Sequence, residues 1–114
     1  MERDTSLFIQ DIKESIDLIE RYLAGISKEK FSKEIQLQDC VTRRLEIIGE
    51  ATKNIPPQLK ALYPEVEWSK IKGMRDILAH VYFDLNFEKI WYVLQKDLPK
   101  LKPQIDHILT NLHK

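Results

Sequence analysis

Apolar residues recur every three to four positions along nearly the whole of this chain. This spacing matches the period of an α-helix, in which residues three and four apart lie on one face. A helix with an apolar face buries that face against a neighbour, so several such helices pack as a bundle. No segment alternates apolar and polar residues as a half-buried strand does. The sequence therefore predicts an all-α fold, a bundle of four to five helices.

Glycine, serine and proline set the expected helix bounds in the first half of the chain. A first helix is predicted from about Thr5 to Ala24, and Gly25 is its expected C-terminal stop. Ser27 can cap a short turn through Phe31. A second long helix must end before Pro56-Pro57, because proline lacks an amide donor and clashes with the preceding turn. The core residues expected in these helices are Phe8, Ile12, Ile16, Ile19, Leu23 and Ile26, then Leu37, Val41, Leu45, Ile48 and Ile55.

The second half of the chain carries further helical patterns. A short helical turn and a loop are expected over residues 57–68, and Ser69 can cap or begin a third helix. Asn86 is the expected cap of a fourth helix. Pro99 and Pro103 would either kink that helix or start a fifth. The core positions expected here are Met74, Ile77, Leu78 and Val81, then Phe87, Ile90, Trp91 and Leu94, and finally Ile105, Ile108 and Leu112.

Length and charge limit the functions that remain open. A chain of 114 residues is expected to form one domain, residues 1–114, and to bury roughly two thirds of its unfolded surface. Lys plus Arg and Asp plus Glu balance at 18 each, so no overall positive field attracts nucleic acid. A polyanion would therefore bind at a local patch or at one built by a dimer.

Cysteine usage and hydropathy predict where the protein works. Cys40 cannot form an internal disulfide, and its place in a helical pattern favours a buried small hydrophobe over a nucleophile. No apolar run approaches the length of a membrane span, and the charges throughout residues 1–25 exclude a signal peptide. We expect a cytoplasmic protein that is not associated with a membrane.

The segment 72–82 contains an Arg, a His and a Tyr in the pattern RxxxxHxY. Arg75 is a permanent cation whose N–H fork suits phosphate oxygens, and His80 titrates near neutral pH and can transfer protons. Tyr82 adds a phenol, and Asp76 could orient the His80 ring and favour its protonated form. These groups can bind and cleave a phosphodiester. The alternative is a solvated Arg75–Asp76 charge pair, with His80 and Tyr82 packed at a helix end.

Helical geometry sets a condition on such a site. At about 100° per residue, Asp76 and His80 share one row of a helix, whereas Arg75 and His80 lie about 140° apart. One straight helix therefore cannot easily direct Arg75 and His80 at one phosphate. Either the helix loosens near His80, or a two-fold dimer brings the same segment of a second chain alongside. A homodimer with a shared site is the expected form.

Other charged residues could assist nucleic-acid binding or hold a metal. A basic rim for nucleic acid, or equally a set of solvated surface charges, is predicted at Arg43, Arg44, Lys70 and Lys72. Glu46 and Glu50 lie one helical turn apart and could supply half of a carboxylate metal site. Arg43 and Lys53 offer these carboxylates ion-pair partners instead. Because no Glu-x-x-His pair completes a metal site, neither a metal nor a cofactor is predicted.

Histidine and aromatic residues elsewhere carry weaker signals. His107 and His113 are six apart, off the spacing that one helix needs for a shared metal, and are expected to be solvated. Trp91 fits the core stripe. The aromatic residues that could stack on nucleic-acid bases are Trp68, Trp91 and Tyr92. The apolar residues that could face a partner chain are Phe83, Leu85 and Phe87.

The chain resembles the HepT-like branch of the HEPN superfamily in blocks that keep that family's order and spacing over roughly residues 40–105. Those blocks are Arg44–Ala51, Pro64–Trp68, Gly73–Asp76 with His80–Phe83, Phe87–Trp91 and Asp97–Pro99. Their combination is specific, although each block alone is not. The resemblance implies a HEPN-type helical bundle that dimerises and acts as a metal-independent endoribonuclease on RNA, with tRNA or mRNA as the substrate.

The family's functional motif falls on Arg75, Asp76, His80 and Tyr82 and implies a transesterification. The RNA 2′-hydroxyl would be the nucleophile, His80 the general base or acid, and Arg75 the group that stabilises the phosphorane. Tyr82 would position the phosphate or a base, and DNA, which lacks the 2′-hydroxyl, should resist cleavage. The family commonly has Asn at the position of Asp76, which adds a negative charge beside Arg75.

The resemblance also implies a partner. Such proteins are toxins of type VII toxin-antitoxin modules, in which an MntA-type nucleotidyltransferase is the antitoxin and adenylylates the tyrosine that corresponds to Tyr82. The anionic phosphate would then face Arg75 and block RNA. The alternative function is that of a non-catalytic helical binding module that complexes a nucleotidyltransferase.

Overall fold

The computed structural model describes residues 2–75 and 87–113, with the backbone alone for residues 2–4. Every regular element within these ranges is a helix, which confirms the all-α prediction. No helix within them is long and apolar enough to cross a membrane. The elements in chain order are α1 (Glu2–Leu23), α2 (Lys28–Lys33), α3 (Ile35–Lys53), α4 (Pro57–Leu62), α5 (Trp68–Lys72), α7 (Phe87–Tyr92), the π-helical segment η2 (Val93–Asp97) and α8 (Leu98–Leu112).

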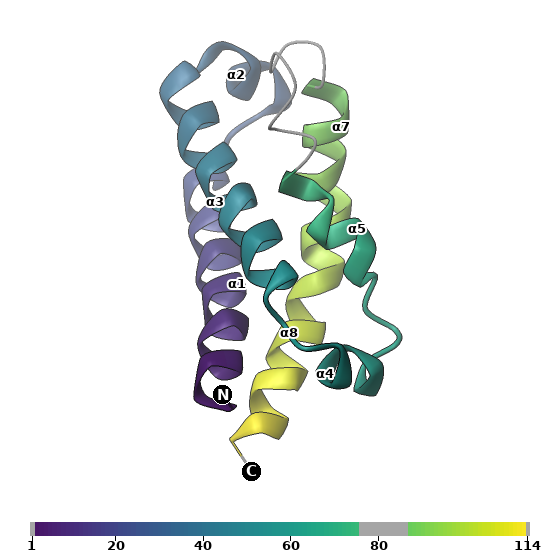
Figure 1. Cartoon of the computed structure of the whole chain (residues 1–114). Coiled ribbons are helices and arrows are strands. Elements are labelled where there is room, and N and C mark those ends of the chain that lie inside the picture. The colour runs from purple at the N-terminus through teal and green to yellow at the C-terminus, as the bar shows by residue number, and fades with distance from the viewer. Residues whose placement is uncertain (1, 76–86, 114) are drawn as a thin grey trace.

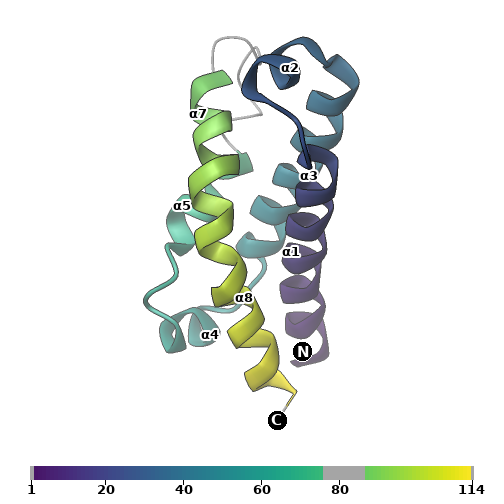
Figure 2. The same cartoon turned by 180° about the vertical axis from the view of Figure 1, so that it is seen from behind.

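Three long helical segments form the bundle: α1, α3, and the continuous run of α7, η2 and α8 (Figure 1). α1 and α3 lie side by side in opposite directions, and α2 covers the end where they are joined, as the reverse view also shows (Figure 2). Both chain termini lie at the other end. α3 contacts α1 and also α5, so it links the first half of the chain to the segment that leads into the RxxxxHxY motif.

The turn between α1 and α3 follows the local predictions. Gly25 has a φ of +74°, a left-handed conformation that glycine adopts without a Cβ penalty, and α1 ends just before it. Ser27 Oγ accepts a hydrogen bond from the Lys30 amide at 3.1 Å and caps α2. The buried Gln38 side chain donates to the Phe31 carbonyl at 2.8 Å, which ties α3 to α2.

The core stripes agree with the predicted period and differ at their ends. Ile9, rather than the half-buried Phe8, extends the buried stripe of α1 formed by Ile12, Ile16 and Ile19. Steps of three and four alternate along this stripe, which keeps its residues on one face, whereas repeated steps of four from residue 8 rotate away from it. At the far end of the bundle, Leu112 lies in the last turn of α8 and is 37% exposed, so it is not a core residue.

Two positions on or near α3 also differ from expectation. Cys40 is exposed, so the prediction of a buried cysteine is wrong. It precedes the buried Val41 by one residue, and this step turns its side chain by about 100° from the core stripe of α3. Ile55 is buried as predicted, but it lies beyond the end of α3, which stops before the two prolines.

The predicted third helix is interrupted. α5 begins at Trp68, one residue before Ser69, and ends at Lys72 with Gly73 as its C-terminal cap. Met74 and Arg75 are again helical. The remaining positions predicted for this helix, and the cap predicted for the next, lie outside the described residues: Ile77, Leu78, Val81 and Asn86.

Pro99 lies within the continuous helical run of α7, η2 and α8, so no break separates it from the residues that precede it. The Leu98 amide donates to the Val93 carbonyl, five residues earlier, so the chain widens into the π-helical turn η2. Pro99 follows in the first turn of α8, and the helix continues through it although proline lacks the amide that would donate to a preceding carbonyl. Pro103 lies within α8, which continues past it to Leu112.

Candidate active site

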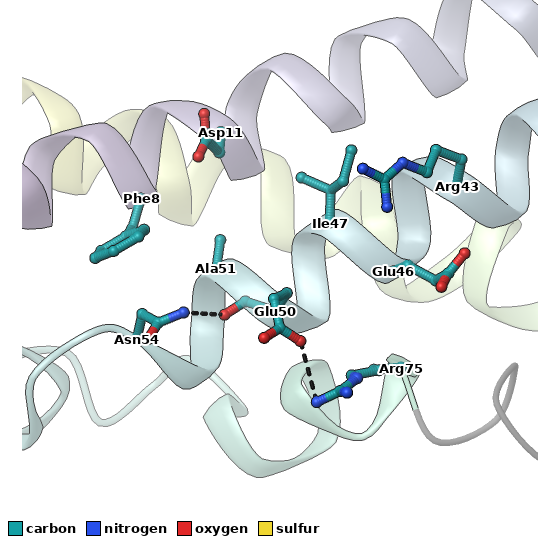
Figure 3. A pocket seen from close by; sticks show the side chains of 9 residues that line it. All are labelled: Phe8, Asp11, Arg43, Glu46, Ile47, Glu50, Ala51, Asn54 and Arg75. Atoms are coloured by element: carbon teal, nitrogen blue, oxygen red, sulfur yellow. Dashed lines mark hydrogen bonds and ion pairs between the residues drawn. The ribbon is translucent and has the colours of Figure 1, made fainter.

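Arg75 is the motif residue that the structure describes. Its Nη1 atom lies 3.0 Å from Oε2 of Glu50 on α3 (Figure 3). The two side chains are 48% and 50% exposed, so the ion pair is open to solvent. The other residues of the motif, Asp76, His80 and Tyr82, lie outside the described residues.

Gly49 allows Arg75 to lie this close to α3. A Cβ atom on Gly49 would lie 2.9 Å from Arg75 Cβ, 3.0 Å from the Arg75 backbone nitrogen and 3.2 Å from the Lys72 carbonyl oxygen. Non-bonded carbon atoms pack best at about 3.5–4.0 Å, so a side chain here would push the Arg75 backbone away from α3. Glycine permits the close approach, and the neighbouring Glu50 then reaches the guanidinium.

A surface pocket of about 340 Å³ extends from this ion pair across α3 to α1 (Figure 3). The charged and aromatic side chains that line it are two guanidinium groups, three carboxylates and one aromatic ring: Arg43, Arg75, Asp11, Glu46, Glu50 and Phe8. Guanidinium groups donate to phosphate oxygens, and carboxylates accept from the N–H groups of bases and the hydroxyls of ribose. The pocket can therefore contact both the backbone and the bases of a nucleic acid.

The structure separates the four residues of the predicted basic rim. Arg43 lines the pocket together with Arg75, and Arg44 is half-buried on α3. Lys70 lies elsewhere, with its Nζ atom 3.0 Å from Asp97 Oδ1 and 5.8 Å from the centre of the Tyr92 ring. The hydrogen bond to Asp97 raises the pKa of Lys70. Lys72 is exposed at the end of α5, and burial together with the Lys72 charge lowers the pKa of nearby Lys60.

Glu50 is paired across the fold rather than along its own helix. The partner expected from the sequence was Lys53, but the structure pairs Glu50 with Arg75. Glu46 forms no ion pair with any residue in the described ranges, including the expected Arg43. Within those ranges, no group of three or more His, Cys, Asp and Glu side chains is placed to hold a metal ion.

Most of the aromatic residues that were candidates for base stacking or partner contacts pack against other residues of the chain instead. Trp68 Nε1 donates to the carbonyls of Lys60 at 3.2 Å and Tyr63 at 3.0 Å. The Trp91 ring lies 5.6 Å from that of Phe31, as the core stripe predicted. Tyr92 is 56% exposed. Phe87 also packs on Phe31, His107 and His113 are exposed as predicted, and Phe83 and Leu85 lie outside the described residues.

Sequence reasoning missed Gly49 and the α1 residues of the pocket, Phe8 and Asp11. Phe8 was assigned to the core, and nothing in the local pattern at Asp11 marks it as part of a site. A signal for Gly49 was present, because a glycine in the middle of a helix of 19 residues lowers helix propensity and calls for a packing reason. The partner that it accommodates could not be named without the fold.

Comparison with known proteins identifies the family. The family model described as "Ribonuclease HepT-like" matches residues 12–108. The chain belongs to the HepT-like ribonuclease family. Its relatives include a "Probable ribonuclease HepT" from Thermococcus cleftensis, which is 40% identical over 108 residues, or 95% of this chain and 98% of that protein.

Two further relatives agree. A "Putative RNase" from Caldanaerobacter subterraneus is 38% identical over 102 residues, which cover 90% of this HepT-like chain and 91% of that protein. A "Gamma-glutamylcyclotransferase and putative RNase" from Methanocaldococcus jannaschii is 41% identical over all 114 residues, and the chain spans 51% of the length of that relative. No solved structure matches. Membership of this family confirms the resemblance drawn from the sequence blocks.

Proposed function

We propose that this HepT-like chain is a metal-independent endoribonuclease. The observation that carries the proposal is the half-exposed guanidinium of Arg75, held by Glu50 at the edge of a pocket with mixed charges. A permanent cation in this position can bind a phosphodiester and remain accessible to RNA. Names of relatives from three organisms support RNA as the substrate.

The reaction is a transesterification within the RNA. His80 accepts the proton of the 2′-hydroxyl, whose oxygen attacks the adjacent phosphorus, and the bond from phosphorus to the 5′-oxygen breaks. The protonated His80 imidazole then donates this proton to the leaving 5′-oxygen, so the products are a 2′,3′-cyclic phosphate and a 5′-hydroxyl. Arg75 stabilises the anionic phosphorane, Tyr82 positions the phosphate or a base, and Asp76 supports His80. Arg43 contributes to RNA binding from the pocket, with Arg44, Lys70 and Lys72 as outer contacts.

The proposed active form is a homodimer, and the proposed setting is a type VII toxin-antitoxin module in the cytoplasm. A dimer would place Arg75 and His80 of two chains around one phosphate, an arrangement that one straight helix does not easily provide. The MntA-type nucleotidyltransferase antitoxin would transfer AMP to Tyr82 and block RNA by charge and bulk. Intact-mass measurement after incubation with that partner and ATP tests this step, because Tyr82→Phe should stay unmodified and escape neutralisation.

Cleavage of a labelled RNA by the full chain tests the nuclease proposal. Arg75→Ala and His80→Ala should each lower the rate by roughly a hundredfold or more, whereas EDTA should have no effect. Arg21→Ala, which removes an exposed cation of the last turn of α1 that does not line the pocket, is the matched control. Activity that is abolished by chelation and restored by a divalent ion would refute the mechanism. A folded chain that binds the nucleotidyltransferase and cleaves no RNA would favour a binding module instead.

A further inference from the structure

We propose that Glu50 is a positioning residue, which holds the Arg75 guanidinium in the orientation needed for phosphate while leaving it free to bind. This inference rests on the proposed nuclease function and deepens it. It concerns the pair described above, in which Nη1 of Arg75 lies 3.0 Å from Oε2 of Glu50.

The donor inventory of arginine permits this double engagement. A guanidinium carries five N–H donors, and one carboxylate in the plane of that group takes at most two of them. At least three donors therefore remain for a phosphate after Glu50 has bound. Because Arg75 is 48% exposed, RNA can reach those donors without displacing Glu50.

The need for positioning follows from the length and exposure of Arg75. A half-exposed arginine samples many rotamers, and catalysis loses rate steeply when a group is displaced by about 1 Å. The backbone at Arg75 is fixed against α3 by the close approach at Gly49. Glu50, the next residue of the same rigid helix, fixes the other end of the side chain (Figure 3).

A competing role makes the opposite prediction. If Glu50 occupied the site that phosphate needs, removal of its charge would free Arg75, strengthen RNA binding and raise the cleavage rate. If Glu50 positions Arg75, removal should lower kcat and leave KM unchanged or lower, because one negative charge near the RNA is gone.

Steady-state cleavage of a short RNA by Glu50→Gln decides between these roles. We expect kcat to fall about tenfold without a rise in KM. Asp39→Asn removes an exposed carboxylate of α3 that does not line the pocket, and it should leave kcat near that of the parent. The effect of Glu50→Gln should vanish in an Arg75→Ala background, measured under single-turnover conditions. A faster Glu50→Gln enzyme, or an equal loss in both backgrounds, would overturn the inference.

A second readout is independent of RNA cleavage. The Arg75 Nη1–Hη1 resonance, assigned by its disappearance in Arg75→Ala, should exchange slowly with solvent in the parent and in Asp39→Asn, because Nη1 is the atom that lies 3.0 Å from Glu50 Oε2. In Glu50→Gln it should exchange as fast as that of a free arginine side chain. If the parent cleaves no RNA, the proposed function fails and this measurement still tests the pair. Unchanged exchange in Glu50→Gln would refute the positioning role.

Discussion

Replacement of Gly49 by alanine tests whether close packing at α3 builds the site. In the interior of a helix, alanine is favoured over glycine by about 1 kcal/mol. At this position, however, the new Cβ would lie 2.9 Å from Arg75 Cβ and 3.0 Å from the Arg75 backbone nitrogen. Overpacking of this kind costs about 1–3 kcal/mol, so it equals or exceeds the gain in propensity. The free energy of unfolding should therefore stay the same or fall by up to about 2 kcal/mol.

The same substitution should disrupt the Arg75–Glu50 ion pair even if the free energy of unfolding changes little. The clash involves backbone and Cβ atoms, which cannot rotate away, so the chain at Arg75 must move from α3. Arg75 then lies farther from Glu50, and we expect RNA cleavage to fall at least tenfold, since a displacement of about 1 Å of a catalytic group can lower the rate a hundredfold.

Gly73→Ala is the matched control for this experiment. A Cβ there would lie 3.4 Å from the Lys70 and Ser69 carbonyl oxygens, an ordinary contact distance, and the φ of −68° suits any residue. Alanine at Gly73 should therefore leave activity unchanged and stabilise the protein by up to about 1 kcal/mol. Urea titration gives both unfolding energies, and the RNA assay gives both rates. A Gly49→Ala protein with full activity and about 1 kcal/mol of added stability would show that the reasoning is wrong.

Two further predictions concern the frame around the site. Gln38→Ala should lower the free energy of unfolding by about 0.5–1.5 kcal/mol, because it removes the 2.8 Å hydrogen bond to the Phe31 carbonyl, which also accepts from the Glu34 amide at 3.4 Å. The exposed Gln36→Ala should lower it by less than about 0.5 kcal/mol in the same urea titration. The hydrogen bond to Asp106 raises the pKa of Lys13 above 10.5, so the stability that its charge contributes is present below pH 10.5 and lost as pH rises through the raised pKa. The small stability difference between the parent and Lys13→Met should thus be constant from about pH 6 to pH 9, and a difference that disappears in that range would contradict the assignment.

The sequence by itself determined the features that depend on neighbouring residues. The 3.6-residue period, the left-handed Gly25 and the Ser27 cap act within one or two turns, so α1, α2 and the end of α3 could be predicted from local pattern. The family blocks likewise located Arg75 as a candidate site residue. At Pro99, local chemistry allowed either a kink or a new helix, and it did not distinguish between them.

Tertiary structure decided which faces and which charges meet. The sequence offered Glu50 a cation one turn away in Lys53, whereas the fold pairs it with Arg75, which lies 25 positions along the chain. That choice depends on how closely the segment after α5 approaches α3, and the approach depends on the missing Cβ of Gly49. The exposure of Cys40 and the burial of Ile9 follow from the rotation of each helix against its neighbours. Such distances and rotations arise from packing between helices, and a one-dimensional pattern does not contain them.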